Sequence, residues 1–191
     1  MARPRSEDKR NAILAAATDV FAERGLGAAT SAISAAAGVA EGTLFTYFRT
    51  KDDLLNALYR EIKLGLADAM MSDFPRKKSV RDRLAHVWTR YVRWGVANPK
   101  AHRVLQQIEV AGALTEESKL AGLAPFVEIQ AMAESAIAQR TVQDLPLPFI
   151  AATMRALAEM TMGFVRQHPD DAELYERSGF EMLWAGLTRK R

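Results

Sequence analysis

Apolar residues recur every three or four positions along most of the chain, and this spacing places them on one face of an α-helix. No stretch of four or more residues alternates cleanly between apolar and polar side chains, as a half-buried strand does. The pattern therefore predicts an all-α protein. Helices are expected at about residues 6–24, 31–37, 41–48, 51–71, 80–97, 116–140, 149–167 and 171–188, with another directly after Asn98.

Several of these expected helices have recognisable ends. Ser6 precedes two acidic residues and is the expected N-cap of the first helix, which Gly25 ends. Thr30 and Thr50 are the expected N-caps of the second and the fourth helix. Gly38 supplies a turn between the second helix and the third.

The clearest boundary candidate is PRKKSVRD, residues 75–82, because a proline stops a helix there and basic residues follow. It predicts an N-terminal domain at residues 1–51, a linking helix at 51–74 and a C-terminal domain at 75–191. Within the C-terminal domain, Pro125 must kink or split the long helix expected at 116–140.

The stretch ISAAAGVAEGTLFTYFRTKDDLL, residues 33–55, breaks a helix at Gly38 and restarts it at once. Two short helices joined by a tight glycine turn form a helix-turn-helix, whose second helix enters the major groove of DNA. Small and polar residues at 40–43 suit that groove, while Phe45 and Phe48 can anchor the rear of the helix. A plain helical hairpin is the alternative interpretation.

Residues 10–62 resemble the DNA-binding region of the TetR family of bacterial transcriptional regulators, through ILAAATDVFAERG, ISAAAGVAEGTLFTYF and KDDLL. The resemblance implies a homodimer, most often a repressor, whose N-terminal heads bind a palindromic operator in double-stranded DNA. It also implies a C-terminal domain that binds a small effector and releases the DNA. By position, it implies contacts from Thr30 and Ser31 to phosphate or bases, from Glu41, Gly42, Thr43 and Thr46 to bases, and from Phe45, Tyr47 and Lys51 to the DNA backbone.

Two positions depart from the family's pattern. Phe45 stands where the family usually has tyrosine, so a hydroxyl contact to phosphate is missing there. Ala29 stands where the family often has threonine or serine, so the resemblance does not settle which residue caps the second helix.

The N-terminal arm is basic, with Arg3, Arg5, Lys9 and Arg10 close together. Such an arm can reach the minor groove or the phosphates beside the operator. A solvated tail without a DNA contact is the alternative. The net charge of +3 permits a nucleic-acid partner but is too small to indicate one by itself.

Composition limits which other classes of protein the chain can belong to. With 191 residues, 49% of them hydrophobic, the chain can bury a sizeable core. It lacks a run of about 18 apolar residues, and MARPRSEDKR lacks the apolar segment of a signal peptide. We therefore expect a cytoplasmic protein with no membrane partner. The absence of cysteine excludes disulfides and thiolate metal sites.

Catalytic machinery is not apparent in the sequence. No serine lies in a nucleophile elbow, and His86, His102 and His168 lie on different segments without the spacing of a helical zinc site. We expect no enzyme activity and no cofactor. The alternative is an all-helical small-molecule carrier or enzyme in which the helix-turn-helix is structural.

Aromatic and methionine residues of the C-terminal domain are candidates for an effector cavity, because such side chains adapt to apolar ligands. We therefore predict a mainly apolar small-molecule effector. For each residue, packing in the core is the alternative, and a regulator that answers to a protein partner or to no effector is a further one. The candidates are Trp88, Tyr91, Trp94, Phe126, Met132 and Met154.

The last two helices carry more apolar surface than one domain can cover. In residues 149–167, Arg155, Glu159 and Arg166 share one narrow stripe and most other positions are apolar. The same pair from a second copy can cover the remaining face in a four-helix contact about a twofold axis. The candidates for this homodimer contact are Met160, Phe164, Phe180, Leu183, Trp184 and Leu187.

Overall fold

The computed structural model describes residues 6–188. These residues form α-helices, two short 3₁₀ helices and loops, with no strand among them, so the prediction of an all-α fold is confirmed. The described residues divide into two compact units. Unit 1 comprises residues 6–65 and 98–124, and unit 2 comprises residues 66–97 and 125–188.

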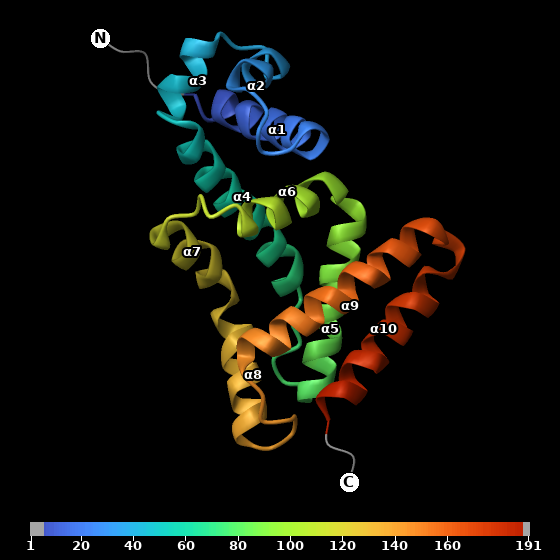
Figure 1. Cartoon of the computed structure of the whole chain (residues 1–191). Coiled ribbons are helices and arrows are strands. Elements are labelled where there is room, and N and C mark those ends of the chain that lie inside the picture. Colours follow the sequence, from blue (N-terminus) through green and yellow to red (C-terminus); the bar gives the residue numbers. More distant parts are fainter. Residues whose placement is uncertain (1–5, 189–191) are drawn as a thin grey trace. The chain divides into compact units, whose positions relative to one another are not determined.

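Unit 1 contains the N-terminal helices and two helices from the middle of the chain (Figure 1). These are α1 (Glu7–Arg24), α2 (Thr30–Ala36), α3 (Glu41–Tyr47), the first part of α4 (Lys51–Met71), α6 (Pro99–Val110) and α7 (Glu116–Leu123). Helix α1 packs against both α2 and α6. The core contains Ile13, Phe21, Ile33, Leu44 and Leu54, all fully buried.

The ends of these helices follow local chemistry. Gly25 and Gly38 have φ angles of +76° and +65°, which glycine adopts without the strain of a side chain. Thr50 and Asp53 cap α4 reciprocally: the Thr50 hydroxyl accepts from the Asp53 N–H at 3.0 Å, and the Thr50 N–H donates to the Asp53 carboxylate at 3.1 Å. The prediction of Thr30 as a cap is wrong, because α2 already includes Thr30 and Ala29 occupies the N-cap.

Unit 2 contains the end of α4, α5 (Val80–Ala97), α8 (Val127–Ala138), α9 (Leu147–Gln167), the 3₁₀ helix η2 (Pro169–Asp171) and α10 (Ala172–Leu187). Helices α5, α9 and α10 pack against one another in its centre. The fully buried Trp88 lies there, and its indole N–H donates to the Glu176 carbonyl at 2.8 Å. The predicted helix at 116–140 is split at Pro125 by the 3₁₀ helix η1 (Ala124–Phe126).

The division into two compact units does not coincide with the predicted boundary. Chain contacts divide α4 between Gly65 and Leu66, and they group α6 and α7 with the N-terminal helices. The functional boundary at residues 74 and 75 therefore stays a prediction. Within residues 6–188, no helix combines the length and apolar character that a membrane span requires.

Candidate DNA-binding surface, effector site and dimer face

Helices α2 and α3 are joined by a tight turn that two backbone hydrogen bonds stabilise. The Gly38 N–H donates to the Ala35 carbonyl at 3.1 Å, and the Val39 N–H donates to the Ser34 carbonyl at 3.0 Å. This backbone reversal brings two short helices of seven residues each into contact. The result is a helix-turn-helix with α3 as its second helix.

Helix α3 has one buried side and one open side. Leu44 is completely buried and Phe48, directly after the helix, is also buried. Phe45 is 40% exposed, so the prediction that it anchors the rear of the helix is wrong. The residues predicted to face the bases lie on the open side, where Glu41, Gly42 and Thr46 are exposed and Thr43 is half-buried.

Two predicted contacts to the DNA backbone already have partners inside the protein. The Tyr47 hydroxyl oxygen accepts from the Ser6 N–H at 2.8 Å, which leaves its own proton to donate elsewhere. The Lys51 ammonium donates to the Ala28 carbonyl at 2.8 Å and lies 5.8 Å from the centre of the Phe21 ring. An ammonium has three protons, so a phosphate can still accept from it.

The predicted contacts from α2 differ in exposure. Ser31 is exposed, whereas Thr30 is half-buried and its hydroxyl donates to the Glu41 carboxylate at 3.0 Å. Arg3 and Arg5 of the predicted arm lie outside the described residues. Lys9 and Arg10 belong to α1, and Arg10 lies 3.5 Å from the Glu61 carboxylate in an ion pair.

Two of the six predicted effector residues share an apolar hollow in unit 2. Met132 and Met154 line it together with residues of α5, α9 and α10, and its volume is about 40 Å³. Drug-sized ligands occupy pockets of about 300–1,000 Å³, so the hollow must widen before it can hold one. It is lined by Val80, Leu84, Met132, Ala133, Ala136, Val142, Ile150, Met154, Leu183 and Leu187.

The other four predicted effector residues do not line this hollow. Trp88 and Tyr91 are buried, while Trp94 and Phe126 are half-buried. A β-carbon placed on Gly179 would lie 2.7 Å from the Trp88 ring, so that ring is in close contact with α10. The structure therefore does not bring the six residues together around the small hollow.

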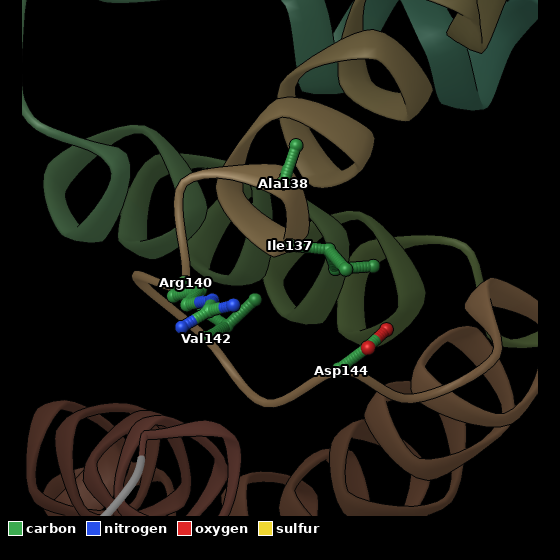
Figure 2. Close-up of a pocket in the computed structure, with 5 residues that line it drawn as sticks. All are labelled: Ile137, Ala138, Arg140, Val142 and Asp144. Atoms are coloured by element: carbon green, nitrogen blue, oxygen red, sulfur yellow. The ribbon is translucent and has the colours of Figure 1, made fainter.

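A second hollow, of about 350 Å³, lies at the loop after α8 and is more polar (Figure 2). Ile137, Arg140, Val142 and Asp144 line it, and the Asp144 carboxylate points away from the Arg140 guanidinium in this view. Gln143 holds the loop through its N–H, which donates to the Leu187 carbonyl at 2.7 Å. Sequence patterns gave no signal for this hollow.

The predicted dimer residues fall into two groups. Met160 and Phe164 are 46% and 44% exposed on α9, one helical turn apart. By contrast, Phe180, Leu183 and Leu187 are buried, and Trp184 is half-buried. The three buried residues are already covered within unit 2, so they can support a dimer face but cannot form its outer surface.

An outward apolar face remains on α9 and α10, two helices that pack side by side (Figure 1). It includes Phe149 and Met182, which are exposed and which both line a shallow groove between the two helices. We call Phe149, Met160, Phe164 and Met182 the outer face of the α9–α10 pair. Large apolar side chains gathered in this way indicate an interaction surface.

Comparison with known proteins places this helix-turn-helix in a family. The sequence profile described as "Bacterial regulatory proteins, tetR family" matches residues 13–58, which run from α1 into α4. Residues 13–58 therefore carry the N-terminal segment that is typical of TetR-family regulators. The match covers the helix-turn-helix and the first part of α4, and it does not extend into unit 2.

A curated relative matches part of the chain. The chain is 35% identical over 80 residues to the fatty acid metabolism regulator protein of Bacillus subtilis (strain 168). That alignment covers 41% of this chain and 41% of the relative, so the match spans less than half the length of either protein.

Solved structures of TetR-family proteins resemble the chain over nearly its whole length. A transcription regulator from Shewanella sp. PV-4 has a TM-score of 0.85 at 22% identity, with 97% of this chain and 100% of that chain covered. FadR from Bacillus subtilis in complex with stearoyl-CoA has a TM-score of 0.71 at 22% identity, with 93% and 99% covered. At such identities, these likenesses show a shared fold.

The sequence patterns gave no prediction for one cluster of polar side chains in unit 1. Asn56 of α4 is only 5% exposed, and its side-chain N–H groups donate to the carbonyls of Asp52 and Ala113 at 2.8 and 2.9 Å. Its carbonyl oxygen accepts from the Thr115 N–H at 2.9 Å. These bonds fasten α4 to the loop that precedes α7.

The neighbouring contacts strengthen this connection. The Arg60 guanidinium donates to the hydroxyl of Ser118, which is completely buried, at 2.5 Å. A β-carbon on Gly122 would lie 2.4 Å from the Tyr59 ring, so α7 comes close to α4 there. Burial, and secondly the charge of Glu109, raise the pKa of Tyr59 above 10.0. We call the contacts of Asn56 and Arg60 with Ala113, Thr115 and Ser118 the α4–α7 clasp.

Proposed function

We propose that this protein is a DNA-binding transcriptional repressor that binds a palindromic operator as a homodimer and leaves it when a mainly apolar small molecule binds. The observation that carries the proposal is the open side of α3, where small and polar residues follow a tight glycine turn. A helix with this surface can enter the major groove without a bulky side chain at its leading end. The match of residues 13–58 to the profile of TetR-family regulators supports the same function.

In this proposal, α3 reads bases and the residues around it bind phosphates. Tyr47 has a hydroxyl proton to donate, and Lys51 has two ammonium protons beyond the one given to Ala28. Phosphate contacts set the position of a protein on DNA, whereas contacts to base edges set its sequence preference. Lys51→Ala should therefore weaken binding to all sequences, while Thr43→Ala should alter the preference among operators.

The homodimer is proposed to form through the outer face of the α9–α10 pair. A twofold contact buries the same patch on both copies, so one set of exposed apolar residues can cover itself. Met160→Glu places a charge in the centre of this patch and should yield monomers. Val110→Glu introduces the same charge at a residue that is 86% exposed on α6, and it should leave the dimer intact. Sedimentation velocity at micromolar protein concentration distinguishes the two outcomes.

The effector is proposed to be a long, mainly apolar molecule. Support comes from the apolar hollow between α5, α8, α9 and α10, whose Met132 and Met154 side chains are flexible enough to rearrange. A structural neighbour binds stearoyl-CoA, and a curated relative regulates fatty acid metabolism, so stearoyl-CoA is the first compound to test. Because α4 runs from unit 1 into unit 2, it provides a continuous connection through which ligand binding can change operator affinity.

The operator experiment begins with DNA from the protein's own promoter region and a selection for bound duplexes. Fluorescence anisotropy then compares the wild type with Lys51→Ala and with Lys119→Ala, which removes the same charge from an exposed position on α7. We expect Lys51→Ala to weaken binding at least ten-fold and Lys119→Ala to change it less than two-fold. Equal effects of the two variants would contradict the proposed surface.

The effector experiment measures operator affinity with and without stearoyl-CoA, and coenzyme A without its acyl chain is the control. The proposal predicts weaker operator binding with stearoyl-CoA and no change with coenzyme A. By linkage, operator DNA must weaken stearoyl-CoA binding by the same factor. If a panel of apolar compounds leaves operator affinity unchanged, release by an apolar effector is wrong, and DNA binding can still stand.

A further inference from the structure

Helices α2 and α3 are joined by a side-chain hydrogen bond as well as by the turn. The Thr30 hydroxyl, at the start of α2, donates to Oε1 of Glu41, at the start of α3, with a distance of 3.0 Å. Among the described residues, no ion pair and no second side-chain hydrogen bond engages the Glu41 carboxylate. The second oxygen, Oε2, is therefore available on the exposed side of the helix.

A carboxylate on a surface that binds DNA is repelled by the phosphates. The backbone of DNA is negatively charged, so a carboxylate that approaches it lowers the sequence-independent part of the affinity. Glu41 also forms no ion pair with a described lysine, arginine or histidine. On a surface that binds DNA, a hydrogen bond accepted from a base can offset this cost.

The major groove offers few donors to a carboxylate. Cytosine presents its N4 amino group, whereas guanine presents two acceptors and thymine an acceptor and a methyl group. Adenine presents an N6 donor, but its neighbouring N7 is an acceptor that repels a carboxylate oxygen. A glutamate at a base edge therefore selects cytosine.

We propose that Glu41 reads one cytosine in each half of the operator through Oε2, and that Thr30 is the positioning residue that holds Oε1. This inference rests on the proposed DNA-binding function and adds the base that one position selects. The threonine bond restricts the rotation of a flexible side chain before DNA is present, so less conformational freedom is lost on binding. Thr30 therefore acts through Glu41, and it need not itself contact a phosphate.

The test measures the affinity of four proteins for a set of operators. The proteins are the wild type, Glu41→Gln, Thr30→Val and Thr30→Ser, and the operators carry each base pair in turn at every symmetrical position. At one position the wild type should prefer cytosine by about five-fold or more, the scale of a good base contact. Glu41→Gln should shift that preference toward adenine, because a glutamine amide matches the N6 donor and N7 acceptor of adenine.

The threonine variants separate positioning from direct contact. Thr30→Val keeps the shape of the side chain but removes the donor, so it should lower the cytosine preference to less than two-fold. Loss of a direct phosphate contact would instead weaken binding to all operators equally. Thr30→Ser keeps a hydroxyl and should restore the preference. Thermal unfolding of each variant checks the fold, and if Thr30→Val unfolds, Glu41→Gln and Thr30→Ser still decide the outcome.

Two further results would overturn the inference. If Glu41→Gln changes the affinity for all operators equally, the Thr30–Glu41 bond only joins the two helices, while the DNA-binding function stands. If the wild type prefers no base at any position beyond two-fold, Glu41 reads no base. Failure of the wild type to bind any duplex would instead contradict the proposed function itself.

Discussion

The replacement of Asn56 by leucine tests the α4–α7 clasp most severely. Leucine has the same branched arrangement of heavy atoms as asparagine, but it can neither donate nor accept a hydrogen bond. The Ala113 carbonyl and the Thr115 N–H would each lose the partner that Asn56 now provides at 2.9 Å. Asn56 is 5% exposed, so water has little access to replace either bond.

The expected cost follows from these two backbone groups. Leaving one buried polar group without a partner costs about 1–3 kcal/mol, so Asn56→Leu should lower the free energy of unfolding by about 2–6 kcal/mol. Asn11→Leu is the matched control, because Asn11 is exposed on α1 of the same unit. Exposed substitutions of this kind change stability by no more than about 0.5 kcal/mol.

The assay should follow unit 1 directly. Trp88, Trp94 and Trp184, the chain's three tryptophans, all lie in unit 2, so their fluorescence does not report the clasp. Urea unfolding followed by circular dichroism gives the free energy, and amide hydrogen exchange in α7 gives the local opening. A loss under 1 kcal/mol for Asn56→Leu, equal to that for Asn11→Leu, would show that the clasp contributes nothing to the stability of unit 1.

Three other predictions concern packing, pH and assembly. Gly179→Ala should destabilise the protein by about 1–3 kcal/mol in urea unfolding, because its β-carbon would lie 2.7 Å from the Trp88 ring. Gly186→Ala, with nothing within 4 Å, should stabilise the same helix by about 0.5–1 kcal/mol. The raised pKa of Tyr59 predicts stability that is complete below pH 10.0 and declines as pH rises above it; Tyr59→Phe should remove that part of the decline in alkaline unfolding curves. Met160→Glu should shift sedimentation from dimer to monomer, since truncating or charging a central interface residue costs about 2 kcal/mol or more.

The fold and the helix-turn-helix could be predicted from the sequence because their signals are local. The three- and four-residue spacing of apolar positions predicts where the helices lie. Gly38 marks the one turn at which the chain reverses between α2 and α3. Pro125 indicated a kink or a split, and the structure shows the split. The N-cap of α2 was missed by one residue, because threonine is a favoured N-cap residue and alanine is not, yet Ala29 occupies that position.

The clasp and the dimer face depend on contacts between distant segments, which periodicity does not reveal. Asn56 and Thr115 are 59 residues apart, and the only hint was a single asparagine within the apolar run LLNALY. Apolar periodicity shows that Phe180 and Leu183 must be covered, but it does not show whether their own unit or a second copy covers them. In unit 2, α5 and α9 already pack against α10.

The salt dependence of operator binding tests the central claim most directly. A homodimer that places two α3 helices in successive major grooves should neutralise about six to ten phosphates, so log affinity should fall against log salt concentration with a slope of about −5 to −9. Anisotropy titrations of a selected operator at several salt concentrations give this slope. An affinity that does not change with salt, or the absence of binding to any selected duplex at low salt, would contradict DNA recognition by this helix-turn-helix.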